Sequence, residues 1–455
     1  MPIPPSSVAG SQSLFSTRKI VHMSMLAFAF LLPFLTWVQA AGCAVLALLF
    51  NLLLLPRLEV DLRKRPADQT AADTWTGIVL YPISVLALIL FYRNSMHVVA
   101  AVWAIMALGD GMASVVGETL RGPTLPYNRE KTWAGFAGFI VAGTVGAYLL
   151  ARWANPLLPA DKVLLVSAAT ALVGAVVETL PIRLDDNVSV PLVCGGFMYC
   201  AFLVEYPALA SNLPYLGRRI ILAVAVNLVF ALLALGLRTI TRSGAVVGFI
   251  LGVTVYLGYG YKSFLILLSF FLLGSLATRL GYAKKAARGV AERRGGARSW
   301  REALANTLAG AFFAVLVITT HWEAAFLVAL VAAFAEAAGD TVSSEIGQWL
   351  SDRAYLITTL EPVPAGENGG VTVGGTVAGL AASVAVVAVG YGFGLSAGAA
   401  TIVALAAAFA GNLLDSVLGA TIERRGLVTN GIVNFAGTSF AGALALAAAF
   451  LLRLR

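Results

Sequence analysis

Hydrophobic residues recur along the chain in long runs separated by short polar segments. A helix needs about 20 apolar residues to cross a bilayer. Read at that length, the pattern predicts spans at 24–38, 42–56, 75–92, 97–117, 133–151, 162–180, 190–208, 219–237, 243–260, 262–280, 303–319, 322–338, 372–392, 396–418 and 432–452. Some runs are short or glycine-rich, so we expect roughly 14–15 spans. The predicted fold class is all-α, a polytopic transmembrane helical bundle.

Composition agrees with this pattern. Hydrophobic residues make up 59% of the chain and charged residues 12%, whereas soluble domains carry about 25% charged residues. A water-soluble fold has too little interior for so much apolar surface, which excludes that class. The segment 1–17 is rich in proline and serine and is expected to be a disordered tail.

The net charge of +8 is concentrated in loops. The cationic loops run from Arg57 to Arg65, from Arg121 to Lys131 and from Arg279 to Arg301. Under the positive-inside rule they face the cytoplasm, which also accounts for the basic stretches without a nucleic-acid partner. We expect a multi-pass protein of a bacterial-type plasma membrane, with its active sites on the cytoplasmic side.

The two halves of the chain share a motif. Gly109-Asp110-x-x-x-Ser114-x-x-Gly117 matches Gly339-Asp340-x-x-x-Ser344-x-x-Gly347 position for position. A second acidic cluster follows 75 residues after each aspartate, at Asp185-Asp186-Asn187 in the first half and at Asp415 in the second. A glycine-rich element lies between the clusters in both halves, at 131–135 and 369–376. We interpret the chain as two related modules.

Asp110 and Asp340 each close an apolar run. An ionisable group at membrane depth is costly, which makes it a functional candidate, although pairing inside the bundle is the alternative. The glycine before each aspartate lets a ligand approach the backbone, and a carboxylate there suits Mg²⁺. Glu118 and Glu345 follow within about two turns and are either second metal ligands or solvated helix ends.

Phosphate-binding candidates precede the predicted helices. The loop 122–132 carries Arg129, Lys131 and Thr132 just before a helix start, where backbone N–H groups attract anions. A positive-inside flank is the alternative, and no Walker A loop is present. Crowding Asp185, Asp186 and Asn187 together favours a metal or metal-nucleotide site over a plain turn.

The second half has corresponding candidates. Arg298 and Arg301 lead into one predicted span. The glycine-rich turn with Glu367, Asn368, Gly369 and Gly370 leads into a later one, and such a turn can present N–H groups to an anion. Asp415 lies deep in an apolar stretch.

Two family resemblances accompany these motifs. Residues 18–208, through RKIVHM, GDGMASVVGETLRG, LPYNREKTWAG and VETLP with DDNVSVPL, resemble the dolichol kinase and phytol kinase family of CTP-dependent polyprenol kinases. Residues 230–452, through RSGAVVG, RGGARSWREALAN, AGDTVSSEIG, ITTLEPVPAGENGGVT and LLDSVLGAT, resemble the phytyl-phosphate kinase family. Asn, Pro and Gly near Ser211–Arg219 separate two sets of spans and predict a boundary there, which gives membrane domains at 18–212 and 213–455.

By that resemblance, the first half phosphorylates an isoprenoid alcohol such as phytol or geranylgeraniol, and the second converts the monophosphate to the diphosphate. CTP or another nucleoside triphosphate is the expected donor and Mg²⁺ the expected cofactor. In the first half, the implied assignments are metal or general base for Asp110, nucleotide phosphates for Arg129, Lys131 and Thr132, and Mg²⁺-nucleotide for Asp185, Asp186 and Asn187. In the second half they are metal for Asp340, Glu345 and Asp415, the lipid phosphate for Arg298 and Arg301, and nucleotide phosphates for Glu367, Asn368, Gly369 and Gly370.

Two other functions use the same residue types. A CDP-lipid synthase-like cytidylyltransferase would also need metal, CTP and a lipid phosphate, but it would attach CMP to the lipid. A repeat-built ion-coupled transporter would use Asp110, Asp340 and Asp415 as ion sites. The transporter leaves the cytoplasmic cations and the Asp185-Asp186-Asn187 triplet unexplained.

Overall fold

The structure is a computed structural model that describes residues 22–57, 71–120 and 122–454. Among these residues, 13 helices are long and apolar enough to cross a membrane. Two shorter apolar helices, His22–Phe34 and Gly77–Phe91, correspond to the predicted spans at 24–38 and 75–92. The prediction of an all-α polytopic membrane protein is confirmed. Residues 1–17 and the 58–65 part of the first cationic loop lie outside the described residues.

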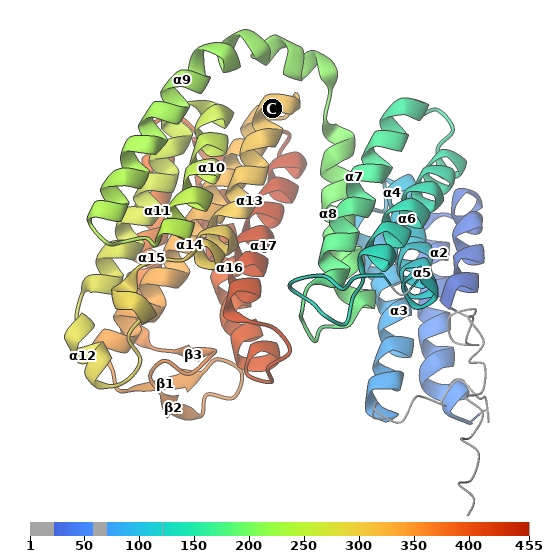
Figure 1. The fold of residues 1–455 in the computed structure, drawn as a ribbon, viewed down its shortest axis with the longest axis horizontal. Helices are drawn as coiled ribbons and strands as arrows, with labels where there is room; N and C mark the ends of the chain where they lie inside the picture. Colours follow the sequence, from blue (N-terminus) through green and yellow to red (C-terminus); the bar gives the residue numbers. More distant parts are fainter. Residues whose placement is uncertain (1–21, 58–70, 121, 455) are drawn as a thin grey trace, which may run out of the picture. The chain divides into compact units, whose positions relative to one another are not determined.

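The chain divides into two compact units, Met1–Leu203 (unit 1) and Val204–Arg455 (unit 2). The division lies before the expected boundary at 212/213. That boundary falls inside α9 (Tyr206–Gly236), which continues through it as one helix (Figure 1). The Asn, Pro and Gly residues of 211–219 therefore do not interrupt the helix, although they resemble a linker in the sequence.

Unit 1 is built around one buried span. α4 (Met96–Ala104), η5 (Ile105–Gly109) and α5 (Asp110–Leu120) follow one another without a break, and every residue from Val98 to Ala104 is buried. η5 is a π-helical turn, a local irregularity frequent at functional sites. The surrounding elements are η1 (Met25–Phe34), α2 (Trp37–Leu49), η2 (Phe50–Leu54), η3 (Leu55–Arg57), α3 (Ala71–Phe91), α6 (Trp133–Ala154), α7 (Ala160–Thr179) and α8 (Asp186–Leu203).

Unit 2 is built around α14 (Glu323–Leu350), in which every residue from Ala325 to Gly339 is buried. The other helices are α9, α10 (Arg242–Tyr259), α11 (Tyr261–Arg279), α12 (Tyr282–Ala287), η6 (Arg293–Gly296), α13 (Trp300–Thr319), α15 (Val373–Gly392), α16 (Ala399–Leu418), η7 (Gly419–Glu423) and α17 (Asn430–Leu451). A small antiparallel sheet of order β2-β1-β3 follows α14, formed by β1 (Arg353–Leu356), β2 (Pro362–Pro364) and β3 (Gly370–Val371). The hydrophobic pattern did not predict this sheet.

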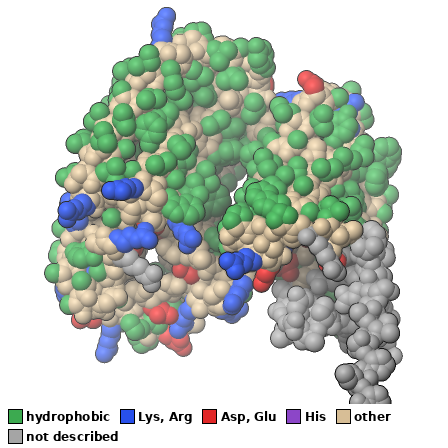
Figure 2. All heavy atoms as spheres, in the orientation of Figure 1, with side chains coloured by type: hydrophobic (Ala, Val, Ile, Leu, Met, Phe, Trp, Pro, Cys, Tyr) green, Lys and Arg blue, Asp and Glu red, His purple; other side chains and the backbone are tan. Residues whose placement is uncertain are grey.

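The helices of unit 2 display a broad hydrophobic surface (Figure 2). Most charged side chains visible on this unit gather at the end that carries α12 and the β-strands (Figure 2). An apolar belt with charges at its end is the surface that a bilayer requires.

A repeated helix contact relates the two units. The Thr132 hydroxyl accepts a hydrogen bond from the Gly135 N–H at the start of α6, and the Thr372 hydroxyl accepts one from the Gly375 N–H at the start of α15. A Cβ added to Gly117 would lie 3.0 Å from the first hydroxyl oxygen, and one added to Gly347 would lie 2.8 Å from the second. Glycine thus permits the same close crossing in both units, as the sequence repeat predicts.

The order of the helices shows which acidic residues of unit 1 and unit 2 occupy equivalent places in the fold. The helices α4–α5, α6, α7 and α8 of unit 1 follow the same sequence as α14, α15, α16 and α17 of unit 2. Asp415 lies near the end of the third helix, where unit 1 has Glu178. Asp185 and Asp186 lie at the start of the fourth helix. The equal spacing of 75 residues therefore matched residues that lie at different places in the fold. The predicted correspondence between Asp185-Asp186-Asn187 and Asp415 was wrong.

Candidate functional site

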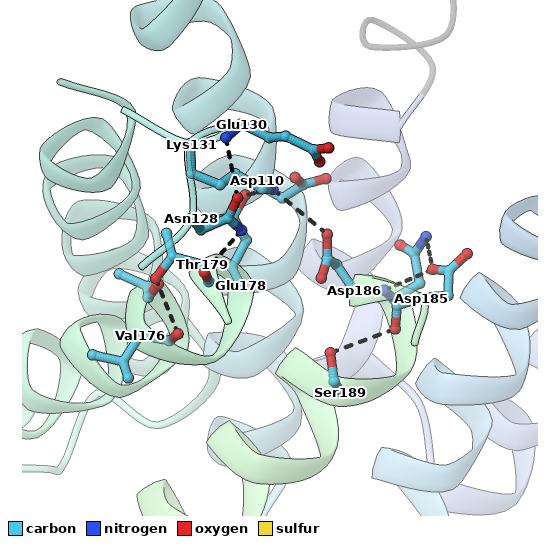
Figure 3. Close-up of polar contacts among 12 residues, drawn as sticks. Asp110, Asn128, Glu130, Lys131, Val176, Glu178, Thr179, Asp185, Asp186 and Ser189 are labelled. Carbon is cyan, nitrogen blue, oxygen red and sulfur yellow. Dashed lines mark hydrogen bonds and ion pairs between the residues drawn. The ribbon is translucent and has the colours of Figure 1, made fainter. Parts of the chain in front are cut away.

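Three carboxylates converge in unit 1. Asp110 opens α5, Glu178 lies in the last turn of α7 and Asp186 opens α8. One oxygen from each lies within 4.8 Å of the others (Figure 3). Asp110 and Asp186 are half-buried and Glu178 is buried. Three carboxylate oxygens from three different helices can together hold a divalent cation.

Lys131 lies beside these carboxylates. Its Nζ is 2.5 Å from Glu178 Oε1 and 3.9 Å from Asp186 Oδ2 (Figure 3). Burial lowers the pKa of Lys131, but the charges of Glu178 and Asp186 raise it by more, so the net pKa lies above its ordinary value. The lysine therefore stays protonated and supplies a fixed positive charge.

The loop before α6 is held against the end of α7. Asn128 Nδ2 donates to the Thr179 backbone oxygen at 3.1 Å, and the Tyr127 and Thr179 hydroxyls lie 3.0 Å apart. Leu125 is fully buried, and its N–H donates to the Lys131 carbonyl. These contacts fix Lys131 next to Glu178, the residue that precedes Thr179.

Asp185 does not join the cluster. Its Oδ1 accepts hydrogen bonds from the backbone N–H and the side-chain Nδ2 of Asn187, at 2.9 and 2.8 Å. This is a capping arrangement at the start of α8, and Asp185 points away from Asp186 in Figure 3. The predicted triplet is thus divided: Asp186 faces the other carboxylates, whereas Asp185 and Asn187 bond to each other.

The remaining candidates of unit 1 lie around the cluster. The Thr132 hydroxyl is occupied by its helix cap, and Arg129 is exposed on the loop. Glu118 is exposed near the end of α5, outside the three-carboxylate group. His22 lies nearer, with its Nε2 3.6 Å from Asp110 Oδ2 and 3.2 Å from the Met106 carbonyl.

A second acidic cluster lies inside unit 2. Asp340 and Asp415 lie close enough for their charges to interact. Glu336 lies one turn before Asp340 on α14 and is only 1% exposed. In the described part of the chain, neither Glu336 carboxylate oxygen nor Asp415 Oδ2 has a hydrogen-bond partner. Buried carboxyl oxygens without partners are costly, so they point to a bound cation or proton.

Glycines surround Glu336. A Cβ on Gly411 of α16 would lie 2.8 Å from Glu336 Cγ, and one on Gly437 of α17 would meet Glu336 Oε1. Both positions therefore accept only glycine while Glu336 keeps its place. Three helices thus enclose the acidic cluster closely.

Arg298 lies next to this cluster, just before α13. Its guanidinium stacks over the Phe270 ring at 5.4 Å. A Cβ on Gly274 would lie 2.5 Å from the guanidinium and 3.2 Å from Thr341, the neighbour of Asp340. Burial lowers the pKa of Arg298, and the charges of nearby acidic residues, Asp340 among them, partly offset this. An arginine nevertheless stays charged.

Two predicted ligands of unit 2 have other partners. Lys285, which is fully buried, donates to Glu345 Oε2 at 2.5 Å and to the carbonyls of Ala277 and Thr278. This ion pair engages one oxygen of the Glu345 carboxylate, Oε2. Arg301 is exposed and lies over the Trp300 ring rather than toward the acidic cluster.

The glycine-rich turn packs on the helix end that follows Asp415. Glu367 pairs with Arg424 at 3.1 Å. Gly369 has φ +73° and lies against Ala420 in η7, and the Gly370 N–H donates to the Glu367 carbonyl. The turn of Glu367, Asn368, Gly369 and Gly370 is therefore brought near the end of α16, a few residues after Asp415.

Comparison with known proteins gives the family. A family model described as "Integral membrane protein DUF92" matches residues 225–450, all within unit 2. An uncharacterized membrane protein of Synechocystis sp. is 36% identical over 200 residues, which cover 43% of this chain and 78% of that protein. The chain belongs to the DUF92 integral membrane protein family.

Two plant proteins are also similar to this member of the DUF92 family. Arabidopsis thaliana "Protein VTE6, chloroplastic" is 34% identical over 234 residues, covering 49% of this chain and 70% of that protein. "Phytol kinase 1, chloroplastic" from the same plant is 30% identical over 138 residues, covering 29% of this chain and 45% of that protein. No solved structure matches the chain.

Glu178 was missed from the sequence, and its role can be tested directly. Glu178→Gln should weaken Mn²⁺ binding to the purified DUF92 family protein by about tenfold or more, because it removes one of three anionic ligands. Electron paramagnetic resonance of free Mn²⁺ measures this. Glu130→Gln, on the exposed loop nearby, should leave binding unchanged. Equal Mn²⁺ affinity in the two variants would remove Glu178 from the site.

Proposed function

We propose that this protein is a bifunctional membrane lipid kinase. Unit 1 phosphorylates an isoprenoid alcohol to its monophosphate, and unit 2 phosphorylates the monophosphate to the diphosphate. Each step uses one nucleoside triphosphate, and the resemblance of the first half to polyprenol kinases favours CTP.

One observation carries the proposal: each unit places an acidic cluster beside a cation, and the first aspartate of each cluster occupies the same place in a repeated four-helix arrangement. Asp110 and Asp340 each lie ten residues before the end of their helix, at Leu120 and Leu350. At 1.5 Å per residue, that is about 15 Å from the helix end. Phosphoryl transfer requires metal, cationic groups and positioning, which both clusters offer.

The relatives support the chemistry at a coarser level. A relative named phytol kinase supports phosphotransfer to an isoprenoid alcohol in a membrane. The similarity spans less than half of that protein, and the family match lies in unit 2 alone. Two activities in one chain, and CTP as the donor, are therefore part of the proposal.

In unit 1, Asp110, Glu178 and Asp186 fit a divalent cation, since their oxygens lie within 4.8 Å of one another. Mg²⁺ there would neutralise charge on the nucleotide phosphates. Lys131 would hold a phosphate oxygen by its fixed charge. The alcohol oxygen forms a bond to the γ-phosphorus, the bond from that phosphorus to the β–γ bridging oxygen breaks, and the nucleoside diphosphate leaves. A carboxylate of the cluster or a γ-phosphate oxygen takes the hydroxyl proton.

In unit 2, the attacking oxygen belongs to a monophosphate and is already anionic, so no base is needed. Arg298 would bind that phosphate and orient it toward the acidic cluster. Buried oxygens of Glu336 and Asp415 have no protein partner among the described residues, and a cation bound between Asp340, Asp415 and Glu336 would satisfy them. The lipid phosphate oxygen then forms the new bond to the γ-phosphorus, and the nucleoside diphosphate leaves.

The proposal places both sites on the cytoplasmic side, where nucleotides are available. A cysteine introduced at Lys284, exposed on α12, should react with a membrane-impermeant maleimide only after the cells are permeabilised. The Cys43→Ser background removes the exposed native thiol. Labelling at position 284 in intact cells would reverse the assigned orientation.

Product analysis tests the chemistry. Purified protein in detergent, given a prenol, Mg²⁺ and CTP, should form prenyl phosphates and release CDP, as mass spectrometry would show. Excess EDTA should stop both steps, and added Mg²⁺ should restore them, because both depend on carboxylate-held metal. CMP attached to the lipid would indicate a cytidylyltransferase instead. Undiminished phosphorylation in EDTA would contradict the metal sites.

A further inference from the structure

An apolar pocket opens beside Arg298 in unit 2. Its lining comes from α9, α10, α11 and the start of α13, which lie together in Figure 1. Five phenylalanines contribute to the lining, Phe230, Phe249, Phe264, Phe270 and Phe271. Along α11 the lining runs from Phe264 to Phe271, about 10 Å at 1.5 Å per residue. The pocket is long enough for the first part of an extended hydrocarbon chain.

Arg298 gives this pocket a cationic wall. The guanidinium stacks over Phe270, itself part of the lining, and lies beside Gly274 and Thr341 next to the acidic cluster. Within the described residues, no carboxylate forms an ion pair with it. Glu302 also lines the pocket, but its carboxylate accepts the Ser299 N–H in a capping box.

We propose that this pocket holds the prenyl chain of the unit 2 substrate, with the terminal phosphate on Arg298. The inference rests on the proposed function and adds where the substrate lies. Charge complementarity selects the occupant, because an amphiphile with one anionic end matches an apolar pocket whose arginine adjoins the acidic cluster. Asn227, a polar side chain of the lining on α9, donates one of its N–H groups to the Ala223 carbonyl of its own helix.

Gly248 offers a way to fill the pocket. It lines the pocket, and a Cβ added there meets no heavy atom within 4 Å, so a phenylalanine ring can enter the space without displacing the backbone. Gly236 provides the matched control. It lies on α9 in equally open surroundings and is not part of the lining.

A comparison of turnover with long and short substrates tests recognition of the prenyl chain separately from recognition of the phosphate. Gly248→Phe should lower kcat/KM for a C20 prenyl monophosphate relative to C5 dimethylallyl phosphate by about tenfold or more, because only the longer substrate needs the filled space. Gly236→Phe should leave this ratio unchanged. Arg298→Ala should weaken turnover of both substrates, because both carry the phosphate. An unchanged ratio in Gly248→Phe would overturn the pocket assignment.

A binding measurement keeps the inference testable without turnover. A prenyl monophosphate with a terminal diazirine should crosslink peptides of α9, α10 or α11 in the full-length protein, and Gly248→Phe should reduce this yield severalfold. Unlabelled prenyl monophosphate should compete, and dioleoyl phosphatidic acid should not. Crosslinking elsewhere, or equal competition by phosphatidic acid, would overturn the assignment. Absence of turnover with correct crosslinking would instead contradict the kinase function.

Discussion

Asp110→Asn should lower formation of prenyl monophosphate from the free alcohol by about 100-fold or more. Asparagine keeps the shape of the side chain but loses the charge that, together with Glu178 and Asp186, would hold the metal. Conversion of supplied prenyl monophosphate to diphosphate should continue at the wild-type rate, since unit 2 has its own acidic cluster. Separate assays with alcohol and with monophosphate measure the two steps.

Two controls accompany this variant. Asp161→Asn changes an exposed aspartate in the first turn of α7 and should leave both steps unchanged. The retained second step shows that unit 2 of the Asp110→Asn protein is folded and that the loss is confined to the first step. Loss of both steps in folded protein would mean that the units share one site, and the two-enzyme account would fail.

Asp340→Asn should produce the opposite defect. The diphosphate step should fall by about 100-fold or more, so prenyl monophosphate should accumulate from alcohol and nucleotide. The physical reason is the loss of one charge from a cluster in which Asp415 lies near Asp340 and Glu336 lies one turn away. Thin-layer separation of radiolabelled prenyl phosphates would show the accumulation.

Asp352→Asn is the matched control in unit 2. Asp352 is exposed and pairs with Arg288 at the surface, and exposed pairs contribute at most about 1 kcal/mol. Both steps should therefore continue in this variant. If Asp340→Asn formed diphosphate as fast as the control, Asp340 would have no part in the reaction.

The helical architecture could be predicted because span length and hydrophobic runs are set by bilayer thickness alone. Local departures from regular α-helix could not be predicted in this way. The π-helical turn before Asp110 and the small sheet after α14 depend on packing and on hydrogen bonds between residues far apart in the sequence. The division of the chain after Leu203 could not be predicted either. The Asn, Pro and Gly residues of 211–219 suggested a linker, but α9 runs through them.

The site of unit 1 was predicted in part. Asp110, Lys131 and Asp186 were chosen from the sequence and do meet. Asp185 and Asp186 are adjacent, and only the cap geometry of α8 decides which one faces the cluster. Glu178 was overlooked as the flank of a span, although an ionisable residue that closes an apolar run was already a sufficient signal.

In unit 2, the missed residue also left a signal in the sequence. Glu336 precedes Asp340 by four residues, a spacing that puts both on one helix face within an alanine-rich run. Glu345 is the opposite case, a residue that was predicted as a metal ligand but has another partner. It was chosen for its place near Asp340, but the buried Lys285 that pairs with it comes from α12, and no local pattern reveals that contact.

The central claim is that one chain carries out two successive phosphoryl transfers at separate sites. The most direct test follows purified wild-type protein over time with an isoprenoid alcohol, CTP and Mg²⁺, and measures lipid products and CDP together. The account predicts that monophosphate appears first and diphosphate follows, with two CDP released for each diphosphate. No phosphorylation of any alcohol, or a monophosphate that never proceeds even when supplied directly, would contradict it.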